Sequence, residues 1–134
     1  MDRDPVLTLE AQARAALKRG DIPAAAAAAK SMILADEAQP AGYFLLGIAA
    51  AEAGQIVKAV PLIEAAVDRG PEAEHLAQLA KLLILLRRDG EAANAARKAM
   101  DLTPGDARTL DTIGCVFTRL GDHEGSVEPF RSAV

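Results

Sequence analysis

Residues 40–71 read PAGYFLLGIAAAEAGQIVKAVPLIEAAVDRGP, two alanine-rich segments on either side of Gly54. The same arrangement of small residues recurs along the chain at intervals of 33 or 34 residues. The equivalent small residues of the first segments are Ala13, Gly47, Ala80 and Gly114. Those of the second segments are Ala25, Ala59, Ala92 and Ser126, followed by Met32, Ala66, Ala99 and Ala133. A period of this length with small residues in both halves is typical of antiparallel helix pairs stacked in a row.

Capping and helix-breaking residues indicate where the helices begin and end. Asp4 is a suitable N-cap with Pro5 at the first helical position, and Gly20 ends the first helix. Asp21 can then cap the second helix. Turns inside the repeats are expected near Gly20, Gly54, Arg87–Gly90 and Gly121, with Asp122 capping the last helix. Pro61 removes one backbone hydrogen bond from the fourth helix, which we expect to survive because its neighbours hold its apolar face.

Four repeats are therefore expected, at about 6–39, 40–72, 73–106 and 107–134, the last one incomplete. They predict eight helices. They also predict a single domain over residues 1–134 without linkers, since no repeat buries its apolar face alone. The last repeat has no following helix to cover Val127 and Phe130. We expect the chain either to be a fragment or to associate with itself through its C-terminal helix.

These features resemble the tetratricopeptide repeat (TPR) family. Repeat two matches its motif best, with Tyr43, Leu46-Gly47, Ala59, Ala66 and Pro71. The resemblance implies an all-α fold, a right-handed superhelix of four helix-turn-helix repeats. The two helices of a repeat then cross closely at Gly47 and at Gly114, so leucine at either place should overpack the crossing by about 1–3 kcal/mol.

Composition and motifs argue against several kinds of function. The net charge is −4, with nine acids and seven bases in residues 1–69 and ten acids and eight bases in residues 70–134, so no basic face suggests nucleic acid. The longest strongly apolar run, Leu82–Leu86, is too short to span a membrane. Enzyme signatures and cofactor motifs are absent, and no metal site is expected because His75 and His123 are isolated, solvent-facing residues. Cys115, the single cysteine, fits a reducing cytoplasmic compartment and is expected to be a partly buried small residue.

The first helices of the repeats supply the candidate binding surface, since in the TPR family they line a concave groove. Groove places transferred from the family give the candidate partner-binding residues Arg14, Phe44, Ile48, Lys81, Ile84, Leu85, Arg108 and Arg119. Phe44 follows Tyr43, the packing residue of the motif, so Phe44 should project into the groove as a binding anchor. The alternative is that Phe44 and Ile84 pack between neighbouring first helices.

A noncatalytic scaffold that binds a peptide or a partner domain in this groove is the function that the resemblance implies. Some members of the family clamp the C-terminal carboxylates of chaperones with side chains at set groove positions, and this sequence does not form that clamp. The clamp positions hold Glu10, Arg14, Leu45, Glu74 and Gln78. Counted from one repeat later, they hold Phe44, Ile48, Gln78, Arg108 and Thr112. The alternative is an N-terminal module of a larger enzyme, since residues 110–134 resemble the repeats of bacterial TPR-sulfotransferase fusion proteins.

Overall fold

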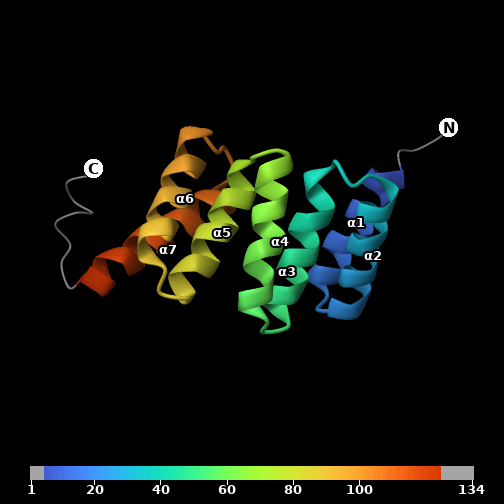
Figure 1. The fold of residues 1–134 in the computed structure, drawn as a ribbon, viewed down its shortest axis with the longest axis horizontal. Coiled ribbons are helices and arrows are strands. Elements are labelled where there is room, and N and C mark those ends of the chain that lie inside the picture. Colours follow the sequence, from blue (N-terminus) through green and yellow to red (C-terminus); the bar gives the residue numbers. More distant parts are fainter. Residues whose placement is uncertain (1–4, 125–134) are drawn as a thin grey trace. The chain divides into compact units, whose positions relative to one another are not determined.

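The computed structural model describes residues 5–124, and all of their regular secondary structure is helical (Figure 1). The helices are α1 (Pro5–Lys18), α2 (Ile22–Ala35), α3 (Pro40–Glu52), α4 (Ile56–Arg69), α5 (Ala73–Leu85), α6 (Asp89–Asp101) and α7 (Ala107–Glu124). The all-α prediction is confirmed. The cap predicted at Asp4 and most of the eighth predicted helix lie outside the described residues.

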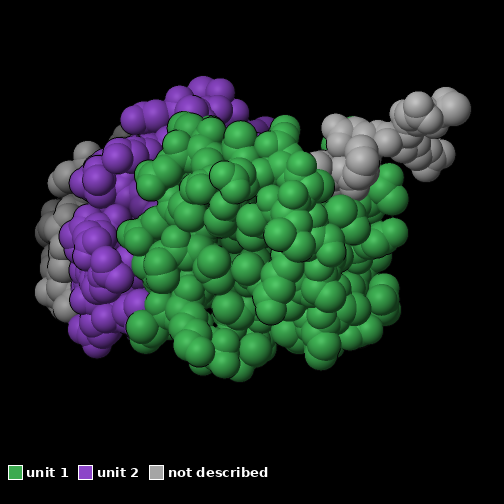
Figure 2. Space-filling view, turned by 45° about the vertical axis from the view of Figure 1, so that its right-hand side comes forward, with its two compact units in different colours: residues 1–71 green, residues 72–134 purple. Residues whose placement is uncertain are grey.

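The chain divides into two compact units, residues 1–71 and residues 72–134 (Figure 2). In unit 1, α1 packs on α2, α2 packs on α3, and α3 packs on α4. In unit 2, α5 packs on α6, and α7 packs on both. The single domain over residues 1–134 stays a prediction.

The turns inside the repeats share one backbone conformation. Gly20 and Gly54 have φ angles of +81° and +84°, the left-handed region that glycine adopts without strain. Arg87 takes the equivalent place between α5 and α6 with φ 61°, although an arginine there is strained. In each turn the next residue donates its backbone N–H to a carbonyl five residues back, at 2.8 Å for Asp21 and 2.9 Å for Gln55 and for Arg88. This closing hydrogen bond is the one expected after a helix C-terminus.

The turn predicted at Gly121 is wrong, because α7 continues through Gly121 and Asp122 to Glu124. Glycine allows a helix to end but does not require it, and inside a helix it costs only about 1 kcal/mol relative to alanine. The cap predicted at Asp122 is wrong for the same reason, while the stop at Gly20 and the cap at Asp21 are confirmed. The side chain of Asp21 accepts the N–H of Ala24 at 3.2 Å, and α4 runs through Pro61 as one helix.

Gly47 lies where α3 and α4 approach each other closely. A Cβ atom placed there would lie 2.6 Å from Cγ1 of Ile63 and 3.3 Å from the carbonyl oxygen of Ala59. Ile63 is 0% exposed, so it has little room to move. The prediction of a close crossing is confirmed for this repeat.

The close crossing predicted at Gly114 stays a prediction, because its partner helix lies outside the described residues. A Cβ atom at Gly114 would meet none of their atoms within 4 Å, and Gly114 is exposed. The repeat pattern places the partner helix for Gly114 in residues that the structure does not describe, whereas α4 supplies that partner for Gly47.

Arg69, the last residue of α4, joins three segments of unit 1. Its Nε donates to the carbonyl oxygen of Glu37 at 2.8 Å, and its NH1 donates to that of Ala65 at 3.0 Å. Its guanidinium carbon lies 3.9 Å from the centroid of the Tyr43 ring, and its NH2 donates to the Tyr43 hydroxyl at 3.2 Å. Tyr43 therefore packs within its own repeat, as its place in the motif predicted.

Candidate functional site

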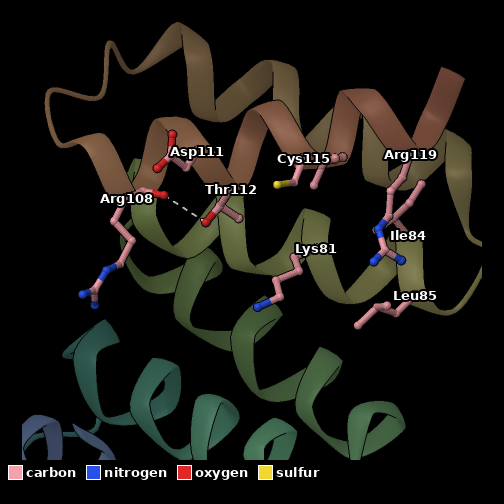
Figure 3. A pocket seen from close by; sticks show the side chains of 9 residues that line it. Lys81, Ile84, Leu85, Arg108, Asp111, Thr112, Cys115 and Arg119 are labelled. Atoms are coloured by element: carbon pink, nitrogen blue, oxygen red, sulfur yellow. Dashed lines mark hydrogen bonds between the residues drawn. The ribbon is translucent and has the colours of Figure 1, made fainter. Parts of the chain in front are cut away.

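A pocket of ≈ 480 Å³ opens between α5 and α7, entirely within unit 2 (Figure 3). Its lining residues are Lys81, Ile84 and Leu85 of α5 and Arg108, Asp111, Thr112, Cys115, Val116 and Arg119 of α7. The spacings of three, four and eleven residues within this set place the side chains of each helix along one face.

The first turn of α7 is fixed by Asp106, directly before the helix. Thr109 donates both its backbone N–H and its hydroxyl to Oδ2 of Asp106, each at 2.9 Å. The backbone hydrogen bond and then the hydroxyl bond from Thr109 hold the pKa of Asp106 below its usual value. Further along, the Thr112 hydroxyl donates to the carbonyl oxygen of Arg108 at 3.0 Å. These contacts hold the turn of α7 that carries Arg108.

The pocket combines an apolar floor with a basic rim. Ile84 is 2% exposed and Val116 is 1% exposed, so they form the floor, while Leu85 is 41% exposed at the edge. Lys81 and Arg119 are exposed, and neither forms an ion pair within residues 5–124. With Arg108 they give the lining three basic side chains against one carboxylate, in a chain whose net charge is −4.

Five of the eight predicted groove residues line this pocket: Lys81, Ile84, Leu85, Arg108 and Arg119. Thr112 and Val116 were not among the candidates, although helical spacing from Arg108 points to both. Cys115 is exposed in the pocket, so the prediction that it is partly buried is wrong. It lies on the open face of α7 because Ile113 and Val116 take the buried positions around it.

The other three candidates, Arg14, Phe44 and Ile48, belong to unit 1. Phe44 is 2% exposed, so it is a core residue and the prediction that it projects into a groove is wrong. The guanidinium carbon of Arg14 lies 6.0 Å from the centroid of the Phe44 ring, and its Nε donates to Oε2 of Glu10 at 3.1 Å. Ile48 is half-buried one turn further along α3. That Arg14 and Ile48 share one binding surface with the pocket stays a prediction.

His75 also differs from its expectation. It is 1% exposed in unit 2 rather than solvent-facing, with Nε2 3.9 Å from Oε1 of Glu72. The sequence did not show this because His75 takes a buried position on α5, next to Leu76. Within residues 5–124, no three His, Cys, Asp or Glu side chains are grouped as metal ligands would be. None of the described helices is long and apolar enough to cross a membrane.

Comparison with known proteins agrees with the repeat architecture. The tetratricopeptide repeat family matches residues 10–74 and again residues 46–107. The chain therefore belongs to the tetratricopeptide repeat family. A search of curated proteins gives no match.

Solved structures that are similar in fold include the following three. The first TPR of Spaghetti (RPAP3), bound to the HSP90 peptide SRMEEVD, is 16% identical over 90% of this chain and 99% of that one, with a TM-score of 0.77. The Yersinia enterocolitica type III secretion chaperone SycD, in complex with a peptide of the translocator YopD, is 16% identical over 90% and 93%, with a TM-score of 0.75. A mutant Thermobaculum terrenum O-GlcNAc transferase is 22% identical over 90% of this chain but only 23% of the enzyme, with a TM-score of 0.76. At these identities the likeness shows the fold alone.

Proposed function

We propose that this chain is a noncatalytic protein-interaction scaffold whose α5–α7 pocket binds a peptide segment of a partner. The observation that carries the proposal is the pocket itself. It is ≈ 480 Å³ in volume, within the range of binding pockets, and joins a buried apolar floor to exposed polar groups. Two structures of the same fold, Spaghetti and SycD, hold peptides, which supports a peptide as the ligand class.

The proposal includes a cytoplasmic location and the further possibility of self-association through the C-terminal helix. A reducing compartment suits an exposed single thiol, because Cys115 would otherwise be open to oxidation or to pairing between chains. Self-association has a direct measurement, the molar mass from light scattering over a concentration series. A mass that stays at the 14.0 kDa of one chain at every concentration would contradict it.

The second candidate is a TPR module of a larger enzyme, such as a sulfotransferase. The O-GlcNAc transferase neighbour favours this class, since there a similar array makes up only part of an enzyme. A gene that continues past Val134 into a catalytic domain would support the module. The pocket could still bind a peptide in that setting, so the two candidates differ in what the scaffold is attached to.

Cys115 offers a direct test of the pocket, because it is the only cysteine in the chain and lies exposed in the lining. A random-peptide display library is selected on the protein, and each selected peptide is then tested on protein whose Cys115 carries a bulky maleimide. We expect the modification to abolish binding, and a Cys115→Ser variant treated with the same reagent to keep it. Peptides that bind the modified protein as well as the free one, or a library that yields no binder, would contradict the proposal.

A further inference from the structure

The cations of the pocket are spread along its length. Arg108 and Arg119 are eleven residues apart on α7, a rise of about 16 Å at 1.5 Å per residue. Lys81 reaches from α5 toward the space between them (Figure 3). An extended peptide rises about 3.3 Å per residue, so about five residues would span the row of cations.

Two of these cations have no carboxylate partner among the described residues. Arg14, Arg19 and Arg88 each form an ion pair with a nearby carboxylate. Lys81 and Arg119 have no such partner within residues 5–124, although acids outnumber bases in the chain by 19 to 15. Exposed cations that converge on one pocket favour ligands of opposite charge, both during encounter and in the complex.

The two ends of the row are not equivalent. Asp111 lines the pocket near Arg108, and Asp106 interacts electrostatically with the same guanidinium. Among the described residues, no acidic side chain lines the other end, where Leu85 and Arg119 lie (Figure 3). The electrostatic attraction for a carboxylate is therefore concentrated at Lys81 and Arg119.

The floor supplies the second requirement for the ligand. Ile84 and Val116 are the buried apolar residues of the lining, and Leu85 presents an exposed apolar side chain near Arg119 (Figure 3). An apolar side chain of the ligand would remove this surface from water. The part of the lining that the structure describes has no aromatic ring for base stacking, which disfavours a single-stranded nucleic acid as the source of the negative charge.

We infer that the pocket selects an extended acidic peptide segment of about five residues, with an apolar side chain on the floor and its carboxylates at Lys81 and Arg119. This inference rests on the proposed function and names the ligand class of that same pocket. It does not need the chaperone clamp, because a different set of side chains supplies the charge.

Fluorescence anisotropy with four fluorescein-labelled pentapeptides that have blocked termini tests the inference. They are Glu-Leu-Glu-Leu-Glu, the same peptide with Gln or with Lys in place of every Glu, and the Gly-spaced peptide Glu-Gly-Glu-Gly-Glu. We expect the acidic leucine peptide to bind at least about tenfold tighter than the Gln peptide, since charged hydrogen bonds are stronger than neutral ones. The Lys peptide should not bind, the Gly-spaced peptide should bind more weakly, and about 0.5 M salt should reduce the difference between Glu and Gln.

Variants that each remove one positive charge test which side chains bind the acidic peptide. Lys81→Gln and Arg119→Gln should each weaken the acidic peptide about tenfold and leave the Gln peptide nearly unchanged, and Arg108→Gln should have the smaller effect. Lys98→Gln is the matched control, because Lys98 is an exposed base of unit 2 on α6, outside the pocket.

Each contrary outcome separates this inference from the proposed function. If the Glu and Gln peptides bind equally, charge selection is wrong while peptide binding stands. If library peptides bind at Cys115 but none of the pentapeptides does, the ligand class is likewise wrong. Displacement of the acidic peptide by inorganic phosphate or an oligonucleotide at similar concentration would show a general anion site and overturn the inference.

Discussion

Gly47→Ala should destabilise the protein, although the same change inside an open helix is stabilising. The new Cβ would lie 2.6 Å from Cγ1 of Ile63, about 1 Å inside an ordinary carbon–carbon contact. Ile63 is fully buried, so either its side chain or the α3–α4 spacing must shift, at a cost of about 1–3 kcal/mol. Alanine recovers about 0.5–1 kcal/mol of helix stability relative to glycine. The net expectation is a loss of about 0.5–2 kcal/mol in the free energy of unfolding.

Gly114→Ala is the matched control because it occupies the equivalent place in repeat four. Its Cβ would meet none of the described atoms within 4 Å, so among the described residues only the intrinsic helix preference of alanine over glycine contributes. We expect Gly114→Ala to raise the free energy of unfolding by about 0.5–1 kcal/mol. Urea denaturation followed by far-ultraviolet circular dichroism measures both variants, and the two changes should have opposite signs.

A double variant tests whether Ile63 is the cause. Gly47→Ala with Ile63→Ala recreates the alanine pairs found at the equivalent places of repeats one and three, which are Ala13 with Ala29 and Ala80 with Ala96. Its loss of stability should be smaller than the sum of the two single losses, since the added methyl occupies space that Ile63 vacates. Additive losses, or a Gly47→Ala variant at least as stable as the wild type, would refute the overpacking argument.

Three other substitutions test single features of the two units. Phe44→Ala should lower the free energy of unfolding by about 3–5 kcal/mol, because the ring is buried; a urea midpoint that barely moves would show that the ring is not part of the core. Arg87→Gly should raise it by about 0.5–1 kcal/mol because glycine adopts φ 61° without strain, whereas Arg88→Gly, at φ −93°, should not; equal effects would contradict this. Asp106→Ala should destabilise at pH 7. The folded-state pKa of Asp106 is lowered, so its contribution is present above the unfolded pKa of about 3.9 and is lost as pH falls through the folded value. The difference between wild type and Asp106→Ala, measured by thermal unfolding from pH 7 to about 3, should therefore shrink toward acid, and a constant difference would contradict it.

Periodicity predicted most of the backbone. It placed a turn at Arg87 even though no glycine stands there, because the register of the repeats is set by the spacing of small residues and not by one turn residue. It was wrong at Gly121, where α7 continues. Whether a glycine ends a helix or lies in a close crossing depends on the neighbouring helix, which the local sequence does not contain.

The candidate site was predicted in part, by helical phase. The groove places transferred from the family on two first helices included Lys81, Arg108 and Arg119, and these three side chains line one pocket. Phase could not determine burial, because adjacent residues such as Tyr43 and Phe44 point about 100° apart and either can be the one that is covered. The side chain of Phe44 is covered completely, while Tyr43 remains half-exposed beneath the guanidinium of Arg69.

The contacts of Arg69 have a consequence for local opening of the native state. The segment after α2 cannot separate from the end of α4 without breaking the bond to the Glu37 carbonyl, and the start of α3 is held to the same side chain through Tyr43. Backbone amides in these segments, far apart along the chain, should therefore exchange with deuterium as one cooperative group. Removing the guanidinium would divide that group, so that the α2–α3 connection exchanges faster while the middle of α4 keeps its protection.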